Sequence, residues 1–304
     1  MTKPVALLMS DIHLCHVPPV ARSPEPEWYA AMARPLREVR LLVKNLDVPV
    51  LCAGDVFDRW NSPPELVNFA LDNLPDDMIV VPGQHDLPNH SIEEIKRSAF
   101  WTLVACGKAR FVDRGGPVRL GGLEIHGFPY GSTPEPKSGK DRSISVALCH
   151  RYVHCEGATA YPGAPAEANV RGLGDSLSGY HVAVFGDNHI PFSAKVRDCL
   201  VWNCGCLIRR KSDERKITPA VGIMMGDGTV DRHELAVDED FWLDDVAEDT
   251  TVIDGLDNAM DGFLDSLESD AEDSLDFRDG VRKAAAAMGD RRVEKILTEV
   301  LDGR

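Results

Sequence analysis

The sequence predicts an α/β protein of four layers, with two β-sheets packed on each other and flanked by helices. Two observations carry this prediction. Five short apolar runs each end abruptly in a cluster of Asp, His, Gly, Gln or Asn, and runs of this length are typical of buried strands. Between the first two runs, apolar residues recur at helical spacing, so strands alternate with helices as in an α/β fold.

The elements follow in order along the chain. The five runs that predict strands are Val5–Met9, Val48–Cys52, Met78–Val81, Ser145–Cys149 and His181–Phe185. Helices are predicted over Trp28–Leu46 and Pro64–Leu74, and strands that indicate a second sheet over Arg119–His126, Leu200–Asn203 and Ala220–Met225. Because ligands of such sheets collect beyond the carboxyl ends of the strands, the polar clusters there mark the expected site.

Composition and charge narrow the class of protein. The chain has 304 residues, of which 43% are hydrophobic and 27% charged, as in a soluble globular protein with a sizeable core. The net charge of -16 lies almost wholly in residues 234–280, which hold 18 acidic residues and one basic residue. The residues before them are nearly neutral and can approach a phosphate backbone, although they lack the broad basic stripe that binds DNA strongly.

Three segments are predicted from these shifts in composition. Residues 1–233, which contain the predicted strands and their polar clusters, form the main domain, residues 234–257 an acidic linker, and residues 258–304 a helical C-terminal extension with amphipathic spacing. The extension either folds back on the core or binds a partner. No apolar run approaches the ~20 residues that cross a bilayer, and no signal segment is recognisable, so we expect a cytoplasmic protein without membrane contact.

The residues at the strand ends are of the types that bind divalent metal ions. Carboxylate, imidazole and amide groups are suitable ligands, and two ions about 3.5 to 4 Å apart can clamp a phosphoryl group. Asp11 and His13 stand at one strand end, and Asp55 follows Gly54, whose missing side chain leaves the carboxylate free to bridge two ions. The remaining members of the predicted set are Gln84, His150, Asp187 and His189.

The motifs, taken in order, resemble those of the calcineurin-like metallophosphoesterases. The sequence reads D-I-H from Asp11, G-D-V-F-D-R from Gly54, G-Q-H-D from Gly83, C-H from Cys149 and G-D-N-H from Gly186. The family pattern is D-x-H, G-D-x-x-D-R, G-N-H-D/E, a lone H and G-H-x-H. The resemblance spans about residues 5 to 191 and implies the family's four-layer αββα sandwich.

By this resemblance, two divalent ions share one bridging carboxylate. The residues it assigns to the first ion are Asp11, His13, Asp55 and His189, and those it assigns to the second are Asp55, Gln84, His150 and Asp187. His85 falls where the family keeps a histidine that protonates the leaving oxygen, and Asp86 would orient it. Asp58 and Arg59 would support the ligands without binding metal.

Two departures from the family pattern fall on the second ion. Gln84 replaces the family's Asn and Asp187 replaces its His, so the second site becomes richer in oxygen ligands. Oxygen-rich sites favour manganese or magnesium over softer metals, and Mn²⁺ is the expected ion, with Mg²⁺ as the alternative. If the second site held no ion, the chain would be a scaffold that retains the fold without catalysis.

A second resemblance narrows the substrate. The segments Gly186–Phe192, Val201–Arg210 and Gly83–Ser91 are similar to the SbcD-type nucleases of DNA repair and their phage relatives. That subfamily cleaves DNA with manganese and pairs with a coiled-coil ATPase through the region after its catalytic domain, which here would be residues 258–304. His90, close to the proposed acid, is a candidate for contact with the substrate, with a surface or packed histidine as the other interpretation. Arg209 and Arg210, in the one basic cluster, either contact a backbone phosphate or belong to a solvated loop.

The sequence thus predicts a two-metal-dependent phosphodiesterase, with DNA as the expected substrate. The expected activity is that of an exonuclease in DNA repair or recombination, which works by attack of a metal-bridging hydroxide. Two other interpretations stand beside it. One is a phosphoesterase that acts on a small phosphodiester or nucleotide, and the other is a non-catalytic scaffold.

Overall fold

The computed structural model describes residues 2–138, 143–155, 157, 159–161, 163–237 and 239–247. The chain divides into two compact units, Met1–Leu243 and Asp244–Arg304. The structure describes only residues 244–247 of the second unit, which belong to the short helix α4 (Leu243–Ala247). The predicted helical extension therefore lies outside the described residues. None of the described helices is long and apolar enough to cross a membrane.

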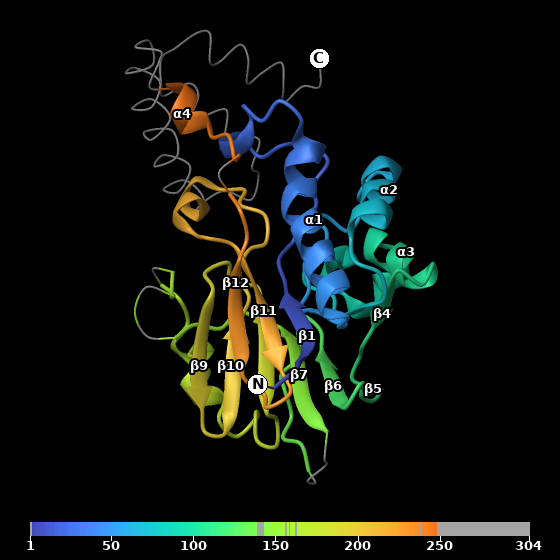
Figure 1. Cartoon of the computed structure of the whole chain (residues 1–304), viewed down its shortest axis with the longest axis vertical. Coiled ribbons are helices and arrows are strands. Elements are labelled where there is room, and N and C mark those ends of the chain that lie inside the picture. The colour runs from blue at the N-terminus through green and yellow to red at the C-terminus, as the bar shows by residue number, and fades with distance from the viewer. Residues whose placement is uncertain are drawn as a thin grey trace, which may run out of the picture. The chain divides into compact units, whose positions relative to one another are not determined.

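The described part of the first unit contains two six-stranded sheets (Figure 1). Their strands are β1 (Pro4–Met9), β2 (Val50–Cys52), β3 (Met78–Val80), β4 (Ala109–Phe111), β5 (Val118–Leu120), β6 (Leu123–Phe128), β7 (Ile144–His150), β8 (Val182–Gly186), β9 (Phe192–Val196), β10 (Cys199–Asn203), β11 (Ala220–Met225) and β12 (Val230–Glu234). The strand order is β12-β11-β1-β2-β3-β4 in the first sheet and β5-β6-β7-β8-β10-β9 in the second. Strands β1 to β4 of the first sheet run parallel, as do β6, β7, β8 and β10 of the second, so the carboxyl ends of each set meet at one edge. Strand β11 is antiparallel to β1.

Three helices cover the outer face of the first sheet: α1 (Trp28–Leu46), α2 (Pro64–Asn73) and α3 (Ala99–Ala105). The buried side of α1 carries Met32, Leu36 and Val39, which share one apolar cluster with Leu7 and Met9 of β1. These helical residues recur at spacings of three and four, which places them on one face of the helix. The predicted boundaries of this helix, Trp28 and Leu46, are confirmed.

The inner faces of the two sheets pack against each other. Leu8 and Leu51 of the first sheet share an apolar cluster with Val146 and Val184 of the second. The outer face of the second sheet is covered by the short 3-10 helix η5 (Val170–Leu173), which follows η4 (Ala166–Ala168), and by the loop after η5. The predicted four-layer sandwich is confirmed, with 3-10 turns where the fourth layer was expected to be helical.

One predicted strand is wrong. Residues 119–126 were expected to form a single strand, but the structure breaks them into β5 and β6, which pair antiparallel as a hairpin. Gly121 and Gly122 form the turn, with φ angles of 56° and 83°. Left-handed conformations at both central positions are what a two-residue hairpin turn requires, and glycine adopts them without steric cost.

Candidate metal centre

The polar clusters after β1, β2, β3, β7 and β8 come together where the two sheets meet. The backbone N–H of Asp187, after β8, donates to the carboxylate of Asp11, after β1, at 3.0 Å. Nδ1 of His150, at the end of β7, donates to the carbonyl of Ala53, after β2, at 2.6 Å. These bonds link the carboxyl ends of one sheet to those of the other, so the predicted ligands converge although the chain separates them widely.

The first group of potential ligands is Asp11, His13 and His189. Their ligand atoms all lie within 4.8 Å of one another. Nε2 of His13 and Nε2 of His189 are 3.1 Å apart, and each is 3.9 Å from Oδ1 of Asp11. A separation of about 3 Å is what two nitrogens show when each lies about 2.1 Å from the same ion at a right angle. The first predicted ligand set is therefore brought together.

The second group lies on the other side of Asp55. Oδ2 of Asp55 is 3.4 Å from Nε2 of His150, and the same nitrogen is 2.7 Å from Oε1 of Gln84. The amide nitrogen of Gln84 donates to Oδ1 of Asp187 at 2.9 Å. Since Oδ2 of Asp55 is also 3.5 Å from Nε2 of His13, this one oxygen lies between the two groups.

The backbone of these residues is held in an uncommon conformation. Asp11, His13, Asp55 and Asp187 all have positive φ angles, of 48°, 48°, 52° and 84°. Non-glycine residues rarely occupy this region, and each instance costs on the order of 1 kcal/mol or more. The surrounding fold must supply this energy, and such residues cluster at functional sites.

Two glycines allow the ligands to lie so close together. A Cβ on Gly83 would lie 2.0 Å from Oδ1 of Asp55, and a Cβ on Gly54 would lie 2.4 Å from Nδ1 of His150. Gly54 also has a φ angle of 94°. Any larger residue at either position would displace a predicted metal ligand.

Burial shifts the pKa values of several groups in the cluster. Burial raises the pKa of Asp11 to about 6, although His189 and His150 oppose the shift. Burial also lowers the pKa of His13 well below its ordinary value. For His150 burial acts against the charged form, but Asp55 outweighs it and raises the pKa to about 10. In the metal-free protein, Asp55 therefore has an imidazolium as its counter-ion.

The donor set fits divalent cations. Oδ2 of Asp55 is buried and has no hydrogen-bond partner among the described residues. A buried carboxylate oxygen left unpaired is costly, and such atoms require an explanation. Cations on the two sides of Asp55 would give this oxygen its missing partners, and the nitrogen and oxygen atoms nearby are ligands of the expected kinds.

Glu214 joins the site without any signal in the sequence motifs. Its Oε1 accepts a hydrogen bond from Nδ1 of His189 at 2.6 Å. The residue lies in the short 3-10 helix η6 (Ser212–Lys216), within a run of basic residues. An isolated Glu in such a run is usually a surface residue, so only the tertiary fold reveals this contact.

His85 is placed as expected, but its partner differs from the expected one. The side chain is exposed beside the cluster, with its ring centroid 4.9 Å from that of His13. Nδ1 of His85 donates to the backbone carbonyl of Asp58 at 2.8 Å. Asp86 instead accepts backbone N–H groups of Val56, Phe57 and Gly83, and so ties the loop after β2 to the loop after β3. The contact that orients His85 thus comes from Asp58, in place of Asp86.

The remaining predicted residues lie in different surroundings. Arg59 and His90 are exposed, and the ring of His90 packs edge-on against Tyr130 with centroids 5.8 Å apart. Arg209 and Arg210 are only 7% and 8% exposed. The guanidinium group of Arg209 binds Asp240, and that of Arg210 binds Asp58. Their predicted contact with substrate stays a prediction, since both groups already have protein partners.

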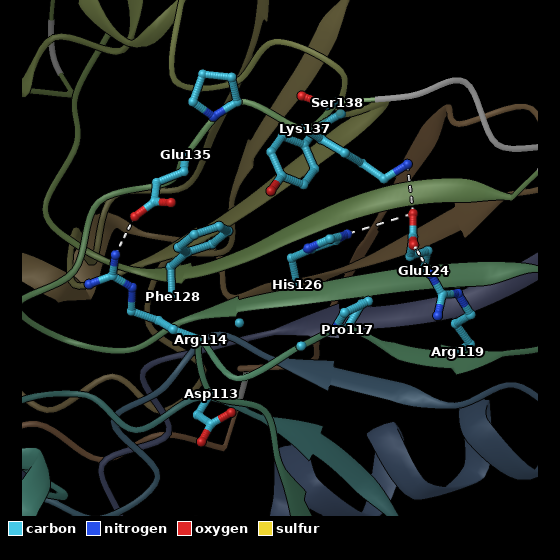
Figure 2. Close-up of a pocket in the computed structure, with 14 residues that line it drawn as sticks. Asp113, Arg114, Pro117, Arg119, Glu124, His126, Phe128, Glu135, Lys137 and Ser138 are labelled. Atoms are coloured by element: carbon cyan, nitrogen blue, oxygen red, sulfur yellow. Dashed lines mark hydrogen bonds and ion pairs between the residues drawn. The ribbon is translucent and has the colours of Figure 1, made fainter.

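A second polar cluster lines a cavity of about 540 Å³ on the outer face of the second sheet. Figure 2 shows Glu124 of β6 at its wall, contacted by Lys137, Arg119 and His126. Nζ of Lys137 lies 2.7 Å and Nε2 of His126 3.6 Å from the carboxylate. This cluster contains none of the residues predicted to bind metal.

The sequence profile of the calcineurin-like phosphoesterases matches residues 5–167 of the chain. The chain belongs to the calcineurin-like phosphoesterase family. No curated protein matches it in sequence. The family uses a dinuclear metal site, so this calcineurin-like phosphoesterase is a metal-dependent hydrolase, and both the family and the metal dependence were predicted from its motifs.

Solved structures of several hydrolases are similar to this calcineurin-like phosphoesterase. One is an archaeal phosphodiesterase, with 14% identity and a TM-score of 0.41 over 76% of this chain and 99% of that one. The sulfate thiohydrolase SoxB of Thermus thermophilus has 13% identity and a TM-score of 0.45 over 80% and 58%. A Staphylococcus aureus protein described as a 5′-nucleotidase has 12% identity and a TM-score of 0.44 over 77% of this chain and 56% of that one.

Proposed function

We propose that this calcineurin-like phosphoesterase is a two-metal-dependent phosphodiesterase that cleaves DNA. The position of Oδ2 of Asp55 is the observation that supports the binding of two metal ions. This buried oxygen is 3.5 Å from Nε2 of His13 and 3.4 Å from Nε2 of His150, and has no hydrogen-bond partner in the described part of the chain. An oxygen shared in this way between two ligand groups is suited to bridge two ions.

Seven side chains would hold the ions. The first set is Asp11, His13, His189 and the shared Asp55, and the second is Gln84, His150, Asp187 and Asp55. Two bound divalent ions would neutralise charge on a phosphoryl group and make a water molecule acidic enough to attack it. Nδ1 of His150 and of His189 donate to Ala53 and Glu214, so Nε2 is the nitrogen of each ring that would bind metal. The oxygen-rich second set favours Mn²⁺, with Mg²⁺ as the alternative.

His85 would donate the proton to the leaving oxygen. Its side chain is exposed at the cluster, where a substrate can reach it. The Asp58 carbonyl accepts the hydrogen of Nδ1, so Nε2 is the ring atom that can exchange a proton with substrate. Asp58 also binds Arg210, which fixes the backbone that holds His85.

The choice of DNA rests on the resemblance of Gly83–Ser91, Gly186–Phe192 and Val201–Arg210 to the SbcD-type nucleases. A coiled-coil ATPase that binds residues 258–304 is part of this proposal, and those residues lie outside the described structure. Such a partner would supply the basic surface that residues 1–233 lack, since they are nearly neutral.

The test is a comparison of substrates with Mn²⁺. We expect loss of labelled linear duplex or single-stranded DNA, and a decrease in kcat of about 10² to 10⁴-fold in His85→Ala with unchanged metal binding. Turnover of only bis-p-nitrophenyl phosphate or a nucleotide would replace DNA with a small substrate. No turnover with any divalent metal would make the chain a scaffold and overturn the proposal.

A further inference from the structure

The segment after β10 contains a buried carboxylate whose two oxygens accept hydrogen bonds from different parts of the fold. Glu214 is only 2% exposed. Its Oε1 accepts the hydrogen of Nδ1 of His189 at 2.6 Å, while its Oε2 accepts the backbone N–H groups of Arg210 and Lys211 at 2.5 Å and 3.0 Å. One side chain therefore connects a predicted metal ligand after β8 to the backbone of the loop after β10, the strand next to β8 in the sheet.

The contact determines which nitrogen of His189 carries hydrogen. A carboxylate can only accept, so Nδ1 must be the donor and Nε2 is left with its lone pair when the ring is neutral. That Nε2 lies 3.1 Å from Nε2 of His13 and 3.9 Å from Asp11.

The loop that carries Glu214 is itself firmly held. The backbone N–H of Leu207 donates to the carbonyl of Asp11 at 3.1 Å, and that of Cys206 to the carbonyl of His189 at 3.1 Å. Further along, Arg209 binds the carboxylate of Asp240 at 2.8 Å, and Arg22 donates to the Arg209 carbonyl at 2.6 Å. The position of Glu214 is therefore fixed by the fold rather than by His189.

We propose that Glu214 is a positioning residue for the first metal ion, which holds the His189 ring so that Nε2 points at Asp11 and His13. The proposal rests on the two-metal function proposed above for the identity of what Nε2 binds. The orientation and the hydrogen position of the ring are properties of the metal-free protein and are tested without any ion.

The first test is a long-range ¹H–¹⁵N NMR measurement of the histidine rings in the metal-free wild-type protein, with His189→Gln for assignment. We expect His189 to carry its hydrogen on Nδ1 whenever the ring is neutral. Hydrogen on Nε2 would overturn the proposal. Because this measurement uses the wild-type chain, it does not depend on whether a Glu214 variant folds.

The second test measures Mn²⁺ and Co²⁺ binding by calorimetry for wild type, Glu214→Gln and Glu135→Gln. A glutamine has one carbonyl oxygen, which can serve His189 or the two backbone donors but not both. We expect the first ion to bind about 10 to 100-fold more weakly to Glu214→Gln, with a changed Co²⁺ absorption spectrum. The control removes an exposed carboxylate that pairs with Arg114 and is expected to bind both ions as wild type does.

A double-mutant cycle separates positioning from general stabilisation of the loop. If Glu214 acts through His189, Glu214→Gln will cost no further affinity in a His189→Ala background. An equal loss in both backgrounds would show a structural role and overturn the proposal, as would wild-type affinity in folded Glu214→Gln. A wild-type protein that binds no divalent ion would instead overturn the proposed function, while the NMR result would still decide the orientation of His189.

Discussion

Two buried carboxylates in this molecule have opposite surroundings. Glu124, on the outer face of the second sheet, is 3% exposed and is contacted by Lys137, Arg119 and His126. Asp55, at the carboxyl ends of the strands, is fully buried and has only imidazole rings for cations, with one oxygen unpaired among the described residues.

In the cluster around Glu124, the protein's own side chains supply the cations that neutralise the carboxylate. The cluster around Asp55 needs an external cation to pair its remaining oxygen. The hydrogen bond from Lys137 is the main cause that lowers the pKa of Glu124 to about 2. At the metal centre, burial opposes ionisation of Asp55, but His150 outweighs it and lowers the pKa of Asp55. Burial raises the pKa of the neighbouring Asp11 to about 6, because His189 and His150 offset the lost water only in part. Burial of a carboxylate therefore does not by itself indicate a metal site. It does so when the surrounding side chains leave one of the carboxylate oxygens without a partner.

The largest expected effect comes from removing the charge of the shared carboxylate. In Asp55→Asn, we expect phosphodiester hydrolysis to fall by about 10³-fold, since both ions lose a charged ligand. Steady-state kinetics with Mn²⁺ measure this effect. Glu124→Gln is the matched variant, because it also neutralises a buried carboxylate, and it should retain wild-type kinetics. Equal losses in the two variants would remove the distinction between the clusters.

Metal should stabilise one cluster and leave the other unaffected. With Mn²⁺ at 100 times the dissociation constant, we expect the free energy of unfolding to rise by about 2.7 kcal/mol for each site. The increase should be largely lost in Asp55→Asn and retained in Glu124→Gln. Urea unfolding with and without Mn²⁺ gives both values, and an increase that survives in Asp55→Asn would contradict a bridging role.

Glu124→Gln should cost about 2 kcal/mol of unfolding free energy, because Lys137, which is 9% exposed, loses its charged acceptor. The loss should be the same with and without Mn²⁺. The control Glu135→Gln removes an exposed ion pair and should change stability by less than about 0.5 kcal/mol. A Glu124→Gln variant as stable as this control would show that the internal cations contribute nothing.

The smallest effect is a difference in pH dependence. The folded-state pKa of Glu124, about 2, lies below its ordinary value of 4.5. Its ionised form therefore stabilises the fold above pH 4.5, and this contribution is lost as pH falls toward 2. Over that range the stability of Glu124→Gln should decrease less steeply than that of wild type. Parallel curves from acid denaturation would contradict the assigned pKa direction.

Much of the site could be predicted because its determinants are local. An apolar run followed by Asp, His or Gly predicts both a strand and the edge at which its polar residues lie, as for Asp11 after β1 and Asp55 after β2. Parallel pairing then brings such ends together without further information. The boundaries of α1 were equally accessible, since its apolar face repeats over the whole helix.

What could not be predicted depends on contacts that the sequence pattern does not contain. The pairing of Glu214 with His189 joins residues from separate loops. The partner of His85 is a backbone carbonyl, which no side-chain motif can reveal. Likewise, a run of basic residues such as the one that contains Arg209 and Arg210 usually lies on the surface. In the structure both side chains are buried, where Arg209 binds Asp240 and Arg210 binds Asp58.

The left-handed backbone at Asp11, His13 and Asp55 has a consequence for how a cation is captured. In the metal-free structure, these residues already have the main-chain torsions that place their side chains in the cluster. An entering ion therefore meets a cage whose shape is already set, and little of its affinity is lost to ordering loose loops. Selectivity between ions of different radius then depends on how far this rigid cage can expand, rather than on which side chains swing toward the ion.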